Sequence, residues 1–319
     1  MYYSILHKTR YRYSAPVTEN VTEVRMQPRS EGLQRCLSFK LTTTPSARVN
    51  SYTDSFGNMI HHFDIPAPHR SITLTAEALV ILPPFDPLPQ ALDPAAWYQL
   101  DAMKANEDVW DFLVPSHFAR PTAELKRLAQ ELDLRRRDDP LSLLCELNRR
   151  IYEVFDYDVE QTTVESPIDV ALNSRRGVCQ DFAHIMIALV RLLGVPCRYV
   201  SGYLFHRVED HDRSEQDATH AWVEALLPGL GWIGFDPTNN LIAADRHIRT
   251  AVGRDYADVP PTRGVFKGRA ESHLAVGVKV MPTEAPIPAE EVQTKPLGGA
   301  VLPPDEPEGE EQQQQEQQQ

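Results

Sequence analysis

The stretch RRGVCQDFAHIMIALVRLLG, residues 175–194, decides the fold of this chain because it joins a helix start, a cysteine and a long apolar run. From Cys179 onward apolar residues occupy most faces of a helix, and Gly194 and Pro196 are helix stop signals. A helix that is apolar on most faces is buried and needs partners on several sides. The sequence therefore predicts a buried helix with a cysteine in its first turn.

Cys179 has two interpretations on its local sequence. The first turn of a helix presents unpaired N–H groups and a positive dipole end, which favour an anion and lower the pKa of a thiol. Gly177, two residues earlier, leaves room for a substrate backbone to approach. A free cysteine can equally be a small apolar residue of a packed core. The local sequence leaves the choice between nucleophile and core residue open.

The residues around this helix predict an α+β domain over residues 121–281. Two amphipathic helices are expected before it, in PTAELKRLAQELDL (121–134) and DPLSLLCELNRRIYEVFDY (139–157). Three runs rich in β-branched and aromatic residues follow it: CRYVSGYLF, THAWVEALL and GWIGFDPT. Such runs with turn residues between them are typical of an antiparallel sheet. The expected core is a cysteine-bearing helix packed on that sheet.

Residues 1–82 predict a separate all-β domain, because apolar and polar residues alternate in short runs between turn formers. DSFGN, at 54–58, is a predicted hairpin turn. A proline-rich linker is expected over 83–120, which begins PPFDPLPQALDP. We find no internal repeat.

The net charge of −13 lies mostly in the C-terminal segment. Residues 282–319 hold nine acidic residues and one lysine, which gives −8 and leaves only −5 for the rest. This segment is rich in Pro, Glu and Gln and lacks aromatic residues, so it is expected to be a disordered tail. The nearly neutral remainder has no long basic run, which argues against a nucleic-acid partner.

The four cysteines are sparse and form no CxxC pair, which argues against a disulfide framework and a structural zinc site. No run approaches the roughly 18 apolar residues that cross a bilayer, and the N-terminus lacks the apolar stretch of a signal peptide. We therefore expect a cytoplasmic protein with reduced thiols and no membrane partner.

A base and an orienting acid follow Cys179 in the sequence. His220 begins the predicted strand THAWVEALL, and Asp236 closes the next one, GWIGFDPT, just before a proline. Each alone has an ordinary explanation, as an exposed histidine and as a turn-forming Asp-Pro step. Adjacent antiparallel strands can, however, bring the two side chains within hydrogen-bond reach. A thiol, a base and an acid in this order are the components of nucleophilic catalysis by cysteine.

Three stretches carry a resemblance: GVCQDFAHIMIALVRLLGVPCRYVSGY, THAWVEALLPGLGWIGFDPTNN and GRDYADVPPTRG. They are similar to the core of the bacterial transglutaminase-like superfamily, and YSILHKTRYRYSAPV resembles the β-rich N-terminal region that accompanies it. The resemblance covers roughly residues 1–281 and implies a papain-like thiol fold. It also implies a Cys-His-Asp triad, which falls on Cys179, His220 and Asp236. We expect no cofactor and no metal.

Three further residues are candidates for the oxyanion site or the cleft. Gln180, at the helix start, could aid the oxyanion, although a capping or solvated role is an equal alternative. Trp222 could line an acyl groove or simply pack in the core. Tyr203 belongs to a stretch that matches the family.

The resemblance implies a cysteine peptidase, amidase or acyltransferase that acts on peptide or protein amides. Two alternatives stay open: a protein-glutamine amine transferase that forms isopeptide crosslinks, and an inactive peptide-binding module. A metal-dependent hydrolase is disfavoured because the sequence contains no HExxH motif. By resemblance alone, relatives are associated with systems that include ATP-dependent, peptide-ligase-type proteins. The sequence leaves the substrate and the oligomeric state open.

Overall fold

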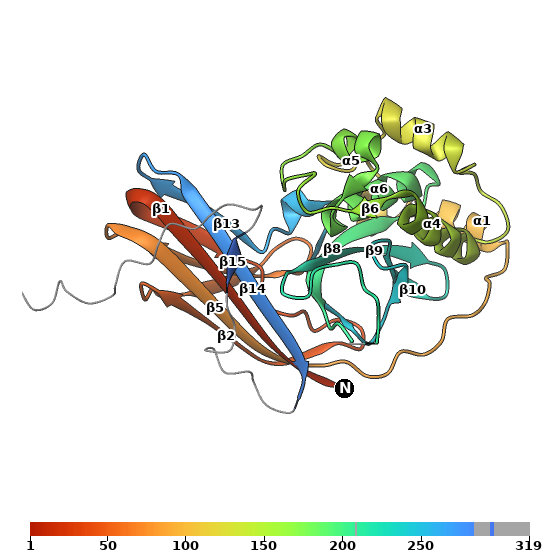
Figure 1. The fold of residues 1–319 in the computed structure, drawn as a ribbon. Coiled ribbons are helices and arrows are strands. Elements are labelled where there is room, and N and C mark those ends of the chain that lie inside the picture. The colour runs from red at the N-terminus through yellow and green to blue at the C-terminus, as the bar shows by residue number, and fades with distance from the viewer. Residues whose placement is uncertain (208, 284–293, 297–319) are drawn as a thin grey trace, which may run out of the picture.

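The computed structural model describes residues 1–207, 209–283 and 294–296. Figure 1 shows two parts side by side, a layer of long strands and a mixed part in which helices pack on a second sheet. The first sheet has eight strands, and the second has five in the order β11-β10-β9-β8-β12. The predicted class, an all-β N-terminal domain and an α+β core, is confirmed.

Strand β1 (Tyr2–Val24) organises the first sheet, here called the β domain. It pairs antiparallel with β5 (His69–Ile81) along one edge and with β14 (Ser272–Pro282) along the other. From Ile72 onward, β5 fully buries every second side chain, as a sheet with one covered face requires. The other strands are β2 (Arg35–Thr44), β3 (Asn50–Thr53), β4 (Met59–Ile65), β13 (Thr262–Lys267) and β15 (Lys295–Pro296).

The domain boundary predicted at the C-terminal end of the core is wrong. Residues 262–281 were expected in the α+β domain, but β13 and β14 pair with β1 and complete the β domain. The physical reason is the length of β1, whose second edge needs backbone partners that the N-terminal residues do not supply. Part of the predicted tail is also ordered, because β15 pairs with β14. Residues 284–293 and 297–319 of that tail lie outside the described residues.

Helix α6 (Cys179–Leu192) lies at the centre of the second part, and every residue from Gln180 to Arg191 is buried. It packs against strands β8 and β9 and contacts helices α3, α4 and α5. Those elements are β8 (Cys197–Leu204), β9 (His220–Leu227), α3 (Ala123–Glu131), α4 (Pro140–Val154) and α5 (Ile168–Ser174). The remaining ones are β6 (Asp156–Tyr157), β7 (Arg176–Gly177), β10 (Gly231–Asp236), β11 (Leu241–Ala243), β12 (His247–Gly253) and a 3-10 turn, Tyr256–Asp258.

The predicted linker, residues 83–120, is more structured than expected. It contains α1 (Ala96–Met103) and α2 (Glu107–Trp110), and Trp97 and Leu100 of α1 are buried in the same core as α6. The guanidinium of Arg136 stacks on the Trp97 ring at 4.8 Å. Residues 83–95, which hold most of the prolines, are irregular and mostly exposed, whereas the segment packs on the core from Ala96 onward.

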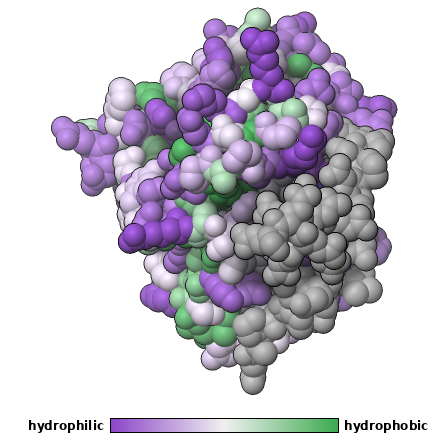
Figure 2. Space-filling model, turned by 90° about the vertical axis from the view of Figure 1, so that its left-hand side faces the viewer, coloured by the Kyte–Doolittle hydropathy of each residue, from purple (hydrophilic) through white to green (hydrophobic). Residues whose placement is uncertain are grey.

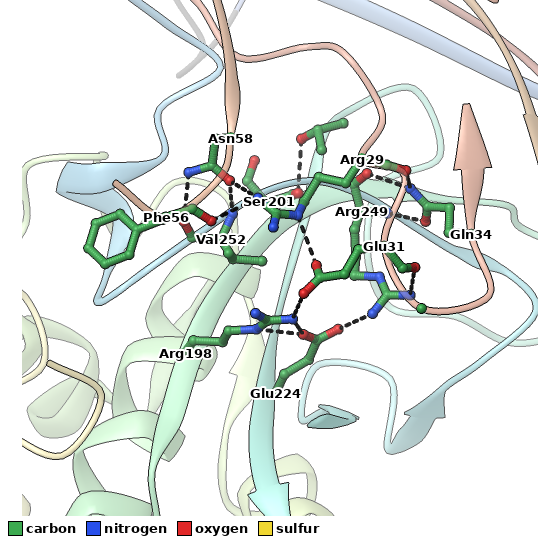
Figure 3. A network of polar contacts seen from close by, with 12 residues as sticks. Arg29, Glu31, Gln34, Phe56, Asn58, Arg198, Ser201, Glu224, Arg249 and Val252 are labelled. Carbon is green, nitrogen blue, oxygen red and sulfur yellow. Dashed lines mark hydrogen bonds and ion pairs between the residues drawn. The ribbon is translucent and has the colours of Figure 1, made fainter. Parts of the chain in front are cut away.

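A polar network joins the β domain to the second sheet (Figure 3). The backbone N–H of Val252 donates to the side-chain oxygen of Asn58 at 2.8 Å, and the Asn58 amide donates to the Val252 carbonyl at 2.8 Å. Gln34 is bonded in the same way to the backbone of Arg249, at 2.8 and 2.9 Å. Side chains from loops of the β domain thus form hydrogen bonds with the backbone N–H and C=O groups on the outer edge of β12. These bonds fix the two parts relative to each other.

The outer face of the β domain is turned to the viewer in Figure 2. Its described residues are mostly hydrophilic, with small apolar groups between them. No helix in the described part of the chain is long and apolar enough to span a membrane.

Candidate active site

Cys179 is the first residue of α6, and its side chain is half-buried. Val178, the N-cap residue, is extended, and its N–H donates to the carboxylate of Asp181 at 2.9 Å. The Thr162 hydroxyl donates to the same oxygen at 2.6 Å. Gly177 makes this turn possible, since a Cβ there would lie 2.6 Å from that oxygen. The helix start that presents the thiol is therefore braced by Asp181.

His220 and Asp236 lie on neighbouring strands, at the start of β9 and the end of β10. Nε2 of His220 is 2.8 Å from Oδ2 of Asp236, and both side chains are buried. Oδ1 of Asp236 accepts the backbone N–H groups of Thr238 and Asn239 at 3.1 and 3.2 Å. Although burial opposes ionisation, the His220 charge and the hydrogen-bond donors keep the pKa of Asp236 well below its usual range.

The protonation of His220 follows from this arrangement. Burial alone would lower the pKa of His220, but the Asp236 carboxylate and Cys179 together raise it to about 10. Because Nε2 is bonded to Asp236, Nδ1 is the ring nitrogen that remains available to the thiol. The three predicted residues are thus brought together, with the His220 imidazole between the Asp236 carboxylate and the Cys179 thiol.

Comparison with known proteins identifies the family. Residues 3–81 match the model of the bacterial transglutaminase-like N-terminal region, and residues 126–237 match that of the transglutaminase-like superfamily. An uncharacterized protein of Mycobacterium leprae is 33% identical over 282 residues, which cover 86% of this chain and 97% of that protein. The chain belongs to the transglutaminase-like superfamily. The resemblance noted in the sequence is confirmed.

This transglutaminase-like protein is also similar to a solved structure and, over a shorter stretch, to a named enzyme. A solved structure from Cytophaga hutchinsonii, named as a proposed cysteine protease, has a TM-score of 0.68 at 22% identity and covers 89% of this chain and 92% of its own. It shares the fold. A protein-glutamine gamma-glutamyltransferase of Pseudomonas aeruginosa is 31% identical over 105 residues, which are 31% of this chain and 16% of that protein.

The structure shows the contacts of the three secondary candidates. The Gln180 amide donates to the Val164 carbonyl at 2.9 Å, so it is committed to the neighbouring loop. Trp222 is fully buried on the face of the second sheet turned away from α6, with Val200 and Val252. Tyr203 is buried at the junction with the β domain and bonded to His7 at 3.0 Å. Packing and interdomain contacts account for these positions, and the Trp222 ring also stacks on the His220 ring, with 6.1 Å between their centroids. The oxyanion and cleft roles of the three residues stay predictions.

The structure adds two residues that the sequence did not indicate, His247 and Tyr157, and Tyr256 from the matching stretch GRDYADVPPTRG also lies at the site. Nε2 of His247, the first residue of β12, lies 3.0 Å from Oδ2 of Asp236. Tyr157 and Tyr256 lie near the thiol: burial raises the pKa of Tyr256 to about 12, and Cys179 adds to this effect. His247 follows a loop and carries no local motif, so only the pairing of β12 with β8 reveals its place.

The side chains of His220, Asp236 and His247 offer a donor set that a metal ion could use, with ligand atoms within 4.8 Å of one another. Direct hydrogen bonds of 2.8 and 3.0 Å, however, join both imidazoles to the same carboxylate oxygen. These contacts account for the cluster without an ion.

Proposed function

We propose that this protein is a thiol-dependent hydrolase or acyltransferase that acts on peptide or protein amides through a thioester at Cys179. The observation that carries the proposal is the buried His220–Asp236 pair, in which Nε2 lies 2.8 Å from Oδ2, beside the half-buried thiol of Cys179 at a helix start. A base held by a carboxylate and facing a nucleophile is the geometry that covalent catalysis needs.

The reaction begins with an ion pair. Because the pKa of His220 is raised to about 10, its imidazole carries a proton at neutral pH and can pair with the Cys179 thiolate. The thiolate attacks the amide carbonyl carbon, and the negative charge moves to the oxygen. Backbone N–H groups at the start of α6, including that of Cys179, stabilise this oxyanion.

Collapse of the tetrahedral intermediate breaks the C–N bond. The proton on Nδ1 of His220 passes to the leaving nitrogen, which departs as an amine and leaves a thioester. His220, now neutral, takes a proton from water as that water attacks the thioester. The thiolate leaves and the product is a carboxylic acid. Asp236 holds the imidazole in place throughout and stabilises its charged form.

The first test is alkylation by iodoacetamide at slightly acidic pH. Burial raises the pKa of Cys36 and Cys197 to about 11 and raises that of Cys145 as well, so these thiols are protonated and slow to react. We expect Cys179 to be labelled first, and Cys179→Ala to abolish this labelling. Cys145→Ala, which removes an exposed cysteine, is the matched control and should label as the wild type does. Equal labelling of the wild type and Cys179→Ala would overturn the proposal.

Amine transfer is the second candidate, favoured by the similarity to the Pseudomonas gamma-glutamyltransferase. Here a primary amine replaces water and forms a new amide. Mass spectrometry of a glutamine-containing peptide, incubated with the protein with and without a primary amine, separates the two reactions. A peptide acid in both incubations identifies a hydrolase, and an amine adduct identifies a transferase. Cys179→Ala is the blank for both products.

A further inference from the structure

The carboxylate of Asp236 is shared by two histidines, and only one of them belongs to the predicted triad. Oδ2 is 2.8 Å from Nε2 of His220 and 3.0 Å from Nε2 of His247. All three side chains are buried and come from three strands, β9, β10 and β12. His247 thus reaches the same carboxylate oxygen as the thiol's base.

The protonation of His247 differs from that of His220. Burial lowers the pKa of His247, and the attraction of Asp236 offsets this only in part. His247 is therefore neutral at neutral pH. Because Asp236 is ionised, it can only accept hydrogen bonds, so the single proton of this imidazole must lie on Nε2. Nδ1 is then left without a partner.

Other charged groups around His247 leave this assignment intact. Arg246 lowers the pKa of His247, as does the positive charge of His220. Arg246 is itself paired with Asp210 and Asp212, at 2.9 and 2.8 Å. Asp245, Glu224 and Arg249 line the same cavity as His247, and each is bonded to a charged partner.

We propose that His247 is a positioning residue, which donates its Nε2 proton to Asp236 and holds that carboxylate toward His220. This inference rests on the proposed function. The Oδ1 side of Asp236 is fixed by two backbone amides, whereas Oδ2 is held by side chains: His220, His247 and the Asn239 amide at 2.9 Å. Without His247 the Oδ2 side loses a fixed donor, and the carboxylate is more easily protonated.

A cavity beside His247 makes the role of its imidazole testable by rescue. Its volume is about 450 Å³, and its lining includes His247, Trp222, Trp232 and Phe85. It lies on the face of the second sheet turned away from α6. A truncated side chain at position 247 opens toward it, so that an added imidazole can take the place of the missing ring.

The test compares His247→Ala, which removes the donor, with His247→Gln, whose amide can replace Nε2–H. The first measurement is the rate of Cys179 alkylation against pH. We expect His247→Ala to slow it about tenfold or more, the effect of losing a hydrogen bond to a charged group. The pH below which the alkylation rate of this variant falls should also be higher, because Asp236 is protonated more readily. His247→Gln should keep most of the rate and the wild-type profile, and imidazole should accelerate His247→Ala alone.

His69→Ala is the control for the loss of a buried histidine, because His69 lies in the β domain away from this site. It should lower the melting temperature without changing the pH profile. The proposal is overturned if His247→Ala and His247→Gln show the same dependence of the alkylation rate on pH. It is also overturned if added imidazole accelerates alkylation in neither variant. Melting temperatures of all variants exclude unfolding as the cause.

A second readout separates this inference from the proposed function. The ring nitrogen resonances of His220, followed by NMR against pH, report the protonation of Asp236 without any substrate. The pH at the midpoint of the acid-side change in these resonances should be higher in His247→Ala than in the wild type, and unchanged in His247→Gln. Absence of selective Cys179 labelling would refute the proposed function but would leave this NMR comparison to decide the role of His247. Unchanged midpoints in both variants would refute that role alone.

Discussion

Glu31 of the β domain lies 3.2 Å from the guanidinium of Arg198 in the second sheet, and Arg198 in turn lies 2.7 Å from Glu224. Figure 3 shows that Arg249 reaches Glu224 from the other side. The side chains of Arg198 and Glu224 are only 6% and 4% exposed. The junction between the two parts is therefore built around a buried carboxylate with two cations.

Glu224→Ala should be strongly destabilising, because it leaves the buried Arg198 guanidinium without its main counter-ion. Breaking a buried ion pair in this way costs about 3–5 kcal/mol. Urea unfolding should show this loss, while Glu153→Ala should cost less than about 1 kcal/mol because the Glu153–Arg149 pair is half exposed. Equal losses in the two variants would mean that the junction does not depend on this carboxylate.

The stability of the protein should fall as the pH rises from about 6.5 to about 10, and His220 should be a cause. The folded pKa of His220, about 10, lies above its ordinary value of 6.5. The stability gained from the His220–Asp236 pair is thus fully present below about pH 6.5 and is lost as the pH rises through 10.

The measurement is the free energy of unfolding against pH for the wild type and for Asp236→Asn. Without the carboxylate, the pKa of His220 is no longer raised, so the variant should lack this part of the slope. All other titrating groups are the same in both proteins. Parallel curves between pH 6.5 and 10 would show that the pair is not ionic in the folded protein.

Tyr203→Phe should affect stability and not the thiol. The Tyr203 hydroxyl is bonded to His7 Nδ1 at 3.0 Å and to the Met26 carbonyl at 3.3 Å, and both partners belong to the β-domain side of the junction. Loss of these bonds should cost about 1 kcal/mol in urea unfolding. The rate of Cys179 alkylation should be unchanged. A slower rate at equal stability would return Tyr203 to the cleft, where the sequence alone placed it.

The fate of Tyr203 illustrates what the sequence could and could not predict. Local patterns located the helix of Cys179 and the strands of His220 and Asp236, and the order of the strands brought the last two together. Strand alternation, however, assigns Tyr203 to a face of the sheet and does not say what covers that face. Its partners, His7 and Met26, are almost 200 residues away in the sequence.

The same limit explains the wrong domain boundary and the missed histidine. Strand patterns in residues 262–281 were compatible with either sheet, and only the unpaired edge of β1 decides between them. His247 reaches Asp236 because β12 returns to the edge of β8, at the far side of the second sheet from β10. Such long-range pairings depend on the whole fold and leave no local pattern.

Gly177→Ala should disturb the thiol through the start of α6. An added Cβ would lie 2.6 Å from the Asp181 carboxylate oxygen and 3.0 Å from its Cβ, so Asp181 would have to move away from the Val178 N–H. We expect a loss of about 1–3 kcal/mol and slower alkylation of Cys179, because the helix start that presents the thiol shifts. Gly229→Ala is the control: its positive φ of 74° adds strain, but a Cβ there meets nothing within 4 Å. It should lose stability and keep the wild-type alkylation rate. Equal alkylation rates in the two variants would show that the reactivity of Cys179 does not depend on the hydrogen bonds of Asp181.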